Sequence, residues 1–249
     1  MKGIPDGVVN LVVTSPPYDN LRNYNSYKFN FENIAKQLYR IIHNNGIIVW
    51  IVGDKIKNGN KSLTSFRQAI YFQDIGFKVH DIMIYKKKNT PFMRTNAYTN
   101  CYELMIVLSK KGPKVFNPLQ TRTVRNGVEK SVFNKGPDAK NIKRKVVLKK
   151  KKTKTNIWAY AVGYGGSTTD RIAFQHPAIF PENLARDHIL SWTNESDLIF
   201  DPMCGSGTTC KMAKLLNRKY IGCDISEEYC TIAKARIKNT VIQKKLKLQ

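Results

Sequence analysis

The sequence of 249 residues has few acidic side chains, only four histidines and no paired cysteines. Its five cysteines, at positions 101, 204, 210, 223 and 230, form no CxxC pair, and the histidines are scattered along the chain. This distribution predicts neither a zinc site nor a disulfide framework, and we expect no bound metal.

Long apolar runs are missing as well. None approaches the ~18 consecutive apolar residues that a membrane-spanning helix requires, and the N-terminus has no secretory signal core. We therefore expect an intracellular, cytoplasmic protein with no membrane partner. With 42% hydrophobic and 24% charged residues, the composition is that of a globular protein able to bury a sizeable core.

The shortage of acidic residues leaves a strongly basic chain. Lysine and arginine number 42 against 18 aspartates and glutamates, which gives a net charge of +24. Such an excess favours a polyanionic partner, and nucleic acid is the first candidate. The alternative is a lysine-rich coding bias that places lysine wherever the surface permits it.

Strand-like and helix-like segments alternate along most of the chain. We predict strands at 8–14, 47–52, 79–85, 103–108, 198–200 and 220–223, and helices at 31–43, 65–75, 181–192, 207–216 and 227–237. Such alternation predicts a mostly parallel sheet covered by helices on both faces. The turn at 163–171, "GYGGSTTDR", receives no role from the sequence.

Residues 109–156 interrupt this alternation. They are dense in Lys, Asn, Gly and Pro and include "KRKVVLKKKKTKT" at 143–155. The segment is too long for a loop inside a compact sheet. We predict a basic insert, either a small subdomain or a partly disordered arm, between a first part at 1–108 and a last part at 157–249.

The stretch "LIFDPMCGSGTTCKMAKLL", 198–216, has the pattern of a strand, a glycine turn and a helix start. It is neither a dinucleotide fingerprint, because position 210 is Cys, nor a Walker loop. Asp224 follows the next strand, where an acidic side chain would reach ribose hydroxyls. The combination suits a nucleoside with a small charged tail, such as S-adenosylmethionine, whose carboxylate would lie at the helix N-terminus. An ordinary strand-to-helix turn is the alternative.

A rigid corner ends the first strand in "LVVTSPPYDN", 11–20, because its prolines cannot donate to a ladder. With a methyl donor nearby, this corner can activate an exocyclic amino group of a base, whose lone pair is otherwise delocalised into the ring. Ser15 Oγ and the Pro16 carbonyl would accept the amino hydrogens, while Tyr18 would stack on a flipped base.

The segments "TSPPY", 14–18, and "DPMCGSGTT", 201–209, resemble the catalytic and cofactor motifs of amino-group DNA methyltransferases. The order along the chain is the catalytic motif, then the basic insert, then the cofactor motif. This permuted motif order resembles that of the β class of these methyltransferases in restriction-modification systems of bacteria or phages. The resemblance covers 5–108 and 157–237. It implies a Rossmann-like α/β methyltransferase fold with a mostly parallel, doubly wound sheet, in which the insert is the target-recognition region. "HPAIFPENL", 176–184, resembles the segment that lines the methionine pocket.

The motifs and the resemblance together give a set of candidate residues. The catalytic candidates are Ser15, Pro16, Pro17 and Tyr18. The cofactor candidates are Thr14, Asp201, Pro202, Met203, Cys204, Gly205, Gly207, Thr208, Asp224, Ile225, His176 and Phe180. His176 is expected to form structural hydrogen bonds rather than to act as a base. The DNA-binding candidates are Arg22, Lys86, Lys87, Arg122, Arg125, Lys143 and Arg144. A solvated surface position is the alternative for Arg22 and for the lysine-rich runs, whereas Arg122 and Arg125 are candidates for reading base edges.

The resemblance implies site-specific methylation of double-stranded DNA on an exocyclic amino group. Ser before Pro-Pro-Tyr favours N4 of cytosine, and N6 of adenine is the alternative. A cognate restriction endonuclease and a homodimer are further partners to expect. RNA or protein substrates stay open, as does a non-catalytic DNA-binding relative. In the family a strand ending in Gly-Asp precedes the segment matched here from Ile4 onward. We expect its absence to weaken cofactor binding unless upstream residues or another chain supply it.

Overall fold

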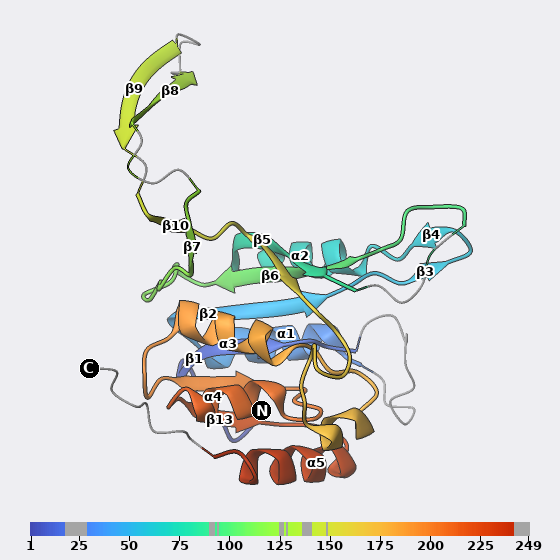
Figure 1. Ribbon diagram of the computed structural model, residues 1–249. Coiled ribbons are helices and arrows are strands. Elements are labelled where there is room, and N and C mark those ends of the chain that lie inside the picture. The colour runs from blue at the N-terminus through green and yellow to red at the C-terminus, as the bar shows by residue number, and fades with distance from the viewer. Residues whose placement is uncertain are drawn as a thin grey trace. The chain divides into compact units, whose positions relative to one another are not determined.

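The computed structural model describes residues 1–17, 29–89, 93, 95–124, 127, 129–135, 141–147 and 149–241. Contacts between Cα atoms divide the chain into two units. The first consists of Met1–Asn117 and Asn156–Gln249, and the second of Pro118–Thr155. The sheet and the helices belong to the first unit, and paired short strands make up the second (Figure 1).

The first unit is built on a seven-stranded sheet in the order β11-β5-β6-β2-β1-β12-β13. Its strands are β1 (Val9–Thr14), β2 (Ile42–Val52), β5 (Lys78–Lys87), β6 (Tyr102–Ser109), β11 (Ile157–Tyr160), β12 (Leu198–Asp201) and β13 (Lys219–Gly222). β6 runs antiparallel to β2 and β5, and every other neighbouring pair is parallel. β3 (Ile56–Lys57) and β4 (Asn60–Lys61) form a separate hairpin. The mostly parallel α/β sheet confirms the predicted fold class.

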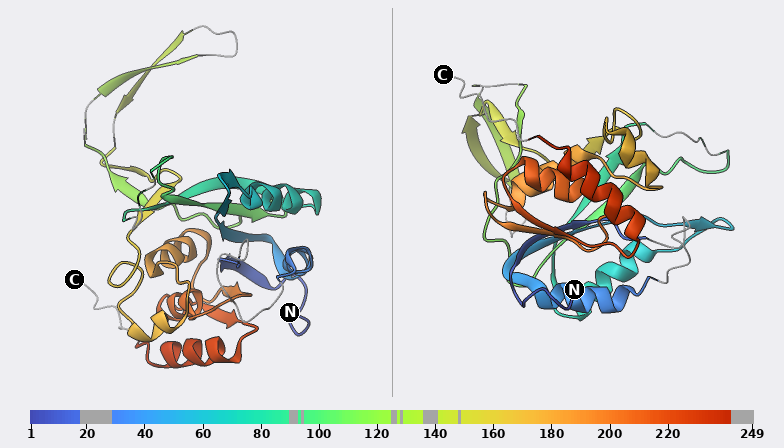
Figure 2. Two further views of the ribbon diagram at one scale, coloured as in Figure 1. Left: turned by 90° about the vertical axis from the view of Figure 1, so that its right-hand side faces the viewer. Right: turned by 90° about the horizontal axis from the view of Figure 1, so that it is seen from below.

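Helices cover both faces of this sheet. They are α1 (Phe31–Ile41), α2 (Thr64–Asp74), α3 (Glu182–Trp192), α4 (Thr208–Leu215) and α5 (Glu227–Lys238), with a 3-10 helix, η1, at Arg171–Gln175. Figure 2 shows α1 and α2 on one side and α3 and α4 on the other. Because strand side chains alternate, Trp50 packs with Phe72 of α2, while Met105 on the opposite face contacts His188 of α3. The sheet is doubly wound, as predicted.

The strand order decides where the motifs meet. β1 lies between β2 and β12, and β12 pairs in turn with β13. Since these strands are parallel, the segments after Thr14, Asp201 and Gly222 leave the same edge of the sheet. Ligands of open α/β sheets bind at this carboxyl edge. Two motifs at opposite ends of the sequence therefore become neighbours.

The second unit consists of two antiparallel strand pairs. β7 (Gln120–Arg122) pairs with β10 (Lys151–Thr153), and β8 (Glu129–Lys135) pairs with β9 (Asn141–Val147). This unit starts at Pro118, later than the insert predicted from Ser109. Residues before Pro118 belong to the first unit because Lys111 donates to Asn44 and Asn117 donates to Ser191 through their backbones.

A few local predictions need correction. The helix predicted for 31–43 ends at Ile41, because Ile42 is extended (φ −70°, ψ 137°) and already begins β2. Strand β11 was not predicted, and the turn at 163–171 leads directly into η1. All five cysteines are free thiols. Among the residues that the structure describes, no helix is long and apolar enough to cross a membrane.

Candidate functional site

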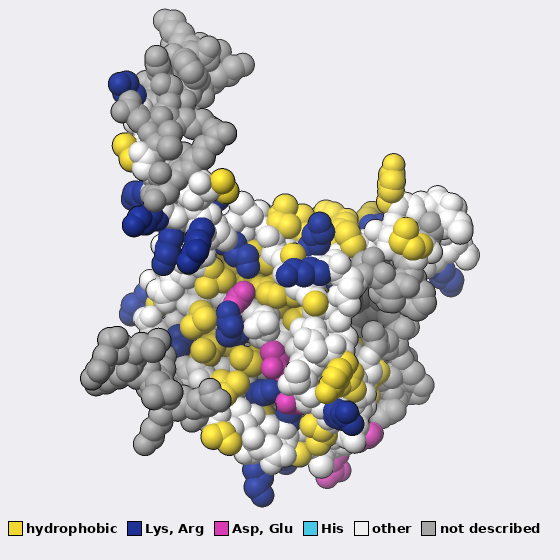
Figure 3. Space-filling model, in the orientation of Figure 1, with side chains coloured by type: hydrophobic (Ala, Val, Ile, Leu, Met, Phe, Trp, Pro, Cys, Tyr) yellow, Lys and Arg dark blue, Asp and Glu magenta, His cyan; other side chains and the backbone are white. Residues whose placement is uncertain are grey.

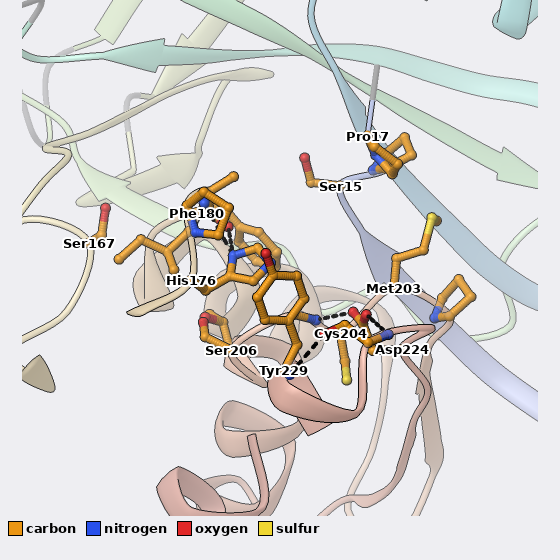
Figure 4. Close-up of a pocket in the computed structure, with 18 of the residues that line it drawn as sticks. Ser15, Pro17, Ser167, His176, Phe180, Met203, Cys204, Ser206, Asp224 and Tyr229 are labelled. Atoms are coloured by element: carbon orange, nitrogen blue, oxygen red, sulfur yellow. Dashed lines mark hydrogen bonds between the residues drawn. The ribbon is translucent and has the colours of Figure 1, made fainter. Parts of the chain in front are cut away.

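A cavity of about 840 Å³ lies in the first unit, a volume within the range of small-molecule sites. Its walls come from the segments that follow β1, β12 and β13, from the stretch between β11 and α3, and from the ends of β5 and β6. Among the lining residues are Ser15, Pro16, Pro17, Phe29, Asn30, Tyr85, Lys87, Glu103, Ser167, His176, Phe180, Pro202, Met203, Cys204, Gly205, Ser206, Thr208, Asp224, Ile225 and Tyr229. Figure 4 shows Ser15, His176, Met203 and Asp224 around the same space.

Thr14 and Asp201 connect the two motifs behind this wall. Thr14 Oγ1 donates to Asp201 Oδ1 at 2.8 Å, and the Met203 N–H donates to the same oxygen at 3.2 Å. Thr209 Oγ1 donates to the Val13 carbonyl at 2.9 Å. Neither Thr14 nor Asp201 is among the cavity-lining residues. Their hydrogen bond therefore joins the carboxyl ends of β1 and β12 and holds the proline corner beside the cofactor motif.

The Asp201 carboxyl group is almost completely buried. Burial raises its pKa to about 6, against the opposing effect of the hydrogen bonds from Thr14 and Met203. No described residue donates a hydrogen bond to Asp201 Oδ2. Desolvation of the buried carboxyl group, which is costly when the group is charged, is the main cause of the raised pKa.

The proline corner lies as the sequence predicts, as far as it is described. Ser15, Pro16 and Pro17 line the cavity directly after β1 ends at Thr14. Figure 4 shows Ser15 and Pro17 near Met203 of the cofactor motif. Tyr18 and Arg22 lie outside the described residues.

The two glycines of the second motif lie differently with respect to the cavity. Gly207 has φ +79°, does not line the cavity, and faces α5: a Cβ there would stand 2.9 Å from Ala233 Cβ. Gly205 has φ +48° and lines the cavity, but a Cβ on it would stand 2.7 Å from His176 Nε2. Both glycines make room for neighbouring protein groups. Of these two cofactor candidates, Gly205 lines the cavity and Gly207 does not.

Asp224 is the acidic group that lines the cavity below the glycine loop. Its Oδ2 accepts from the Gly205 N–H at 2.8 Å and its Oδ1 from the Ser226 N–H at 3.0 Å (Figure 4). The N–H groups of Met203, Cys204 and Gly207 also donate to protein acceptors. The N–H groups of Met203, Cys204, Gly205 and Gly207, which lead into α4, are therefore already paired within the protein. They give no support to the expected binding of a ligand carboxylate at the N-terminus of α4.

His176, Phe180 and Tyr229 form an aromatic side of the cavity. The His176 and Tyr229 rings meet edge to face, with 4.3 Å between centroids. His176 Nδ1 lies 2.6 Å from the Ala178 carbonyl oxygen, so the ring is held by its own segment, in keeping with the structural role predicted for it. The sequence did not point to Tyr229, since its helix pattern resembles that of any core aromatic.

An ion network lies behind the glycine loop. Arg236 of α5 pairs with Asp170 and with Glu182 of α3, and Lys211 of α4 pairs with the same two carboxylates at 2.7 Å. Arg236 also donates to the Ser206 carbonyl at 3.1 Å. The segment 163–171, to which the sequence assigns no role, supplies Asp170. Through Arg236, this residue helps to hold the glycine loop in place.

The DNA-binding candidates lie in different places. Lys87 lines the cavity and pairs with Glu103 at 2.6 Å, whereas Lys86 is exposed on the same strand. Arg122 is exposed on β7 of the second unit. Lys143 and Arg144 are on β9 with only their backbone described, and Arg125 lies outside the described residues. Their role in DNA binding stays a prediction.

Comparison with known proteins gives consistent results. Residues 9–235 match the DNA methylase family of N6 and N4 methyltransferases. The chain is 51% identical to the orphan methyltransferase M.BamHII of Bacillus amyloliquefaciens, over 97% of this chain and 93% of that protein.

Two solved structures share the fold. One is the PvuII DNA methyltransferase (cytosine-N4-specific), with TM-score 0.66, 19% identity and coverage of 94% of this chain and 81% of that one. The other is the M1.HpyAVI–SAM complex, with TM-score 0.57, 24% identity and coverage of 92% and 88%. With the permuted motifs meeting at one cavity, the family match and the close relative lead to one conclusion: the chain belongs to the DNA methylase family of N6 and N4 amino-methyltransferases.

Proposed function

We propose that this protein methylates an exocyclic amino group of a base in double-stranded DNA, with S-adenosylmethionine as the methyl donor. One observation carries the proposal: a single cavity is lined both by the proline corner, Ser15 to Pro17, and by the cofactor motif with Asp224. A methyl donor and its acceptor need such a shared space, because transfer requires the reacting atoms in close contact.

The residues around Asp224 fit this donor. The cavity is large enough for a nucleoside with an amino-acid tail, and Asp224 offers a carboxylate to hydroxyl or ammonium groups. Met203, Ile225 and Tyr229 supply an apolar and aromatic wall for an adenine ring. When bound, S-adenosylmethionine supplies an electrophilic methyl group. The ribose role of Asp224 stays a proposal that binding measurements can test.

The proline corner would act on the base. Ser15 Oγ and the Pro16 carbonyl accept the two amino hydrogens, which localises the nitrogen lone pair for attack. We propose cytosine N4 as the target, because Ser precedes Pro-Pro-Tyr in this chain, with adenine N6 as the alternative. Tyr18 is the proposed stacking partner of the flipped base.

The second unit is the proposed target-recognition region. Figure 3 shows Lys and Arg side chains gathered over β7 and β10, where Arg122, Lys151 and Lys152 are exposed. Contacts from such residues, together with Arg125, Lys143, Arg144, Arg22 and Lys86, would neutralise phosphates and strengthen binding at low salt. A cognate endonuclease, a homodimer and a cytoplasmic location remain predictions.

The test is expression of the full chain in a host without DNA methylases, followed by modification-sensitive sequencing of the host genome. We expect one modified motif, with N4-methylcytosine as the modified base, and its loss in Ser15→Ala. Calorimetry with S-adenosylmethionine on the purified Ser15→Ala variant should show unchanged affinity. An unmodified genome in cells that contain soluble wild-type protein would contradict the proposal, and N6-methyladenine would correct the base.

A further inference from the structure

The ends of β5 and β6 bring a charged pair into the cavity. Lys87 Nζ lies 2.6 Å from Glu103 Oε1, with the two side chains 30% and 12% exposed. Both residues line the same cavity as Ser15 to Pro17 and Asp224. Tyr85 also lines this wall. It is the residue opposite Glu103 in the β5–β6 register, and the centroid of its ring lies 6.0 Å from Lys87 Nζ.

A phosphate contact does not explain this arrangement well. A lysine that serves the DNA backbone gains from an exposed position, as Lys86 has. A phosphate at Lys87 would also stand beside the Glu103 carboxylate, and the two anions would repel each other. A neutral group with a hydrogen-bond acceptor meets no such repulsion.

The Lys87–Glu103 pair is also compatible with the positive charges of the cofactor and of the methylated base in the proposed reaction. Methyl transfer to a neutral amino nitrogen brings a sulfonium and then a positively charged base into the cavity. A lone ammonium nearby would oppose both charges, whereas a lysine paired with glutamate presents N–H donors without net charge. The ring nitrogen beside the amino carbon, N3 of cytosine or N1 of adenine, is an acceptor on the edge that enzymes read in a flipped base.

From these contacts we propose, on the basis of the proposed function, that Lys87 donates a hydrogen bond to this ring nitrogen of the flipped base. Glu103 is a positioning residue that holds the ammonium group in place. Ser15 Oγ and the Pro16 carbonyl would recognise the amino group, which is a donor. Lys87 would recognise the neighbouring ring nitrogen, which is an acceptor. Thymine presents N3–H at that position and would be rejected, because two donors would face each other.

The experiment measures single-turnover methyl transfer by the full chain on a duplex that carries its recognised motif. Lys87→Met should slow transfer about 10- to 100-fold, in line with the loss of one hydrogen bond from a charged donor. The slope of DNA affinity against salt should match the wild type, and the affinity for S-adenosylmethionine should not fall, because the Glu103 carboxylate left behind does not repel the sulfonium. Lys78→Met, on an exposed lysine at the other end of β5, is the matched control and should change none of these three quantities.

A base analogue separates a base contact from a structural effect. The target base is replaced by 3-deazacytosine or 1-deazaadenine, in which the ring nitrogen is a C–H group. Wild-type transfer should fall by a factor similar to that of Lys87→Met, and the analogue should slow Lys87→Met or Glu103→Gln much less. Equal slowing of wild type and Lys87→Met by the analogue would refute the hydrogen bond.

Two further results would overturn the inference. One is normal wild-type transfer to the analogue, a measurement that needs no folded variant. The other is a Lys87→Met enzyme with normal transfer and a salt slope smaller by about 1, which would identify a phosphate contact. A wild-type chain that methylates no DNA would instead refute the proposed function, and that result is seen before any variant is made.

Discussion

Asp201 is a single residue whose burial has a measurable consequence. Its pKa rises from 3.8 to about 6 because the folded protein disfavours the charged form. A group with a raised folded pKa binds protons more tightly when folded. Its contribution to stability is therefore greatest below about pH 4 and is lost as the pH rises through about 6.

Asp201→Asn should remove this dependence. The amide oxygen can still accept from Thr14 and Met203, and no charge is buried at high pH. Relative to wild type, we expect near-equal stability well below pH 4 and a gain approaching about 3 kcal/mol above pH 7. Urea unfolding of both proteins from pH 4 to 8 measures the difference, and a pH-independent difference would contradict the raised pKa.

At the scale of elements, Arg236 connects two helices and two loops. Its side chain is 1% exposed and joins α5 to Glu182 of α3, to Asp170 before η1 and to Ser206 before α4. Ser206 lines the cavity, so the position of this part of the cavity wall depends on how α5 packs. Without Arg236, Asp170 and Glu182 would share Lys211 as their one remaining partner in this network, so one negative charge would be left uncompensated.

Arg236→Met should lower the free energy of unfolding by about 3 kcal/mol, the low end of the effect of breaking buried pairs, since both carboxylates are partly solvated. It should also weaken S-adenosylmethionine binding by about tenfold or more, corresponding to at least about 1.4 kcal/mol. Denaturant titration and calorimetry measure the two effects. Lys234→Met, an exposed position on the same helix, is the control. Unchanged cofactor affinity in folded Arg236→Met would show that the network does not act on the site.

At the scale of the whole molecule, the net charge of +24 predicts DNA binding that weakens steeply as salt rises. Lys150, Lys151 and Lys152 are exposed in the second unit. If each contacts a phosphate, replacing all three by Gln should make the slope of log affinity against log salt less negative by about 3. Filter binding or anisotropy over a range of salt concentrations gives this slope.

The control for that triple variant removes the same charge elsewhere. Lys36, Lys234 and Lys238 are exposed on α1 and α5, and their change to Gln lowers the net charge equally. We expect a smaller change in slope, because only long-range attraction is lost. Equal slopes for the two triple variants would mean that the lysines of the second unit have no special place in DNA binding.

The sequence by itself determined the chemistry at the strand ends. Two prolines cannot continue a ladder, so a corner had to follow Thr14, and the motif around Asp201 had to form a strand-to-helix turn. The parallel sheet followed from alternating periodicities, and the strand before Asp224 from its apolar pattern. These inferences hold because they depend on local backbone constraints.

Only the tertiary structure decided which side chains share the cavity. Glu103 carried no signal in the sequence, and Lys87 looked no different from Lys86. Antiparallel pairing of β5 with β6 sets Glu103 opposite Tyr85, so that Lys87, two residues further along β5, reaches Glu103 with its side chain, and strand alternation turns Lys86 outward. Gly207 likewise faces α5 because helix packing required space there. Register and packing arise from contacts distant in sequence, and a shift of one residue would exchange the roles of the two lysines.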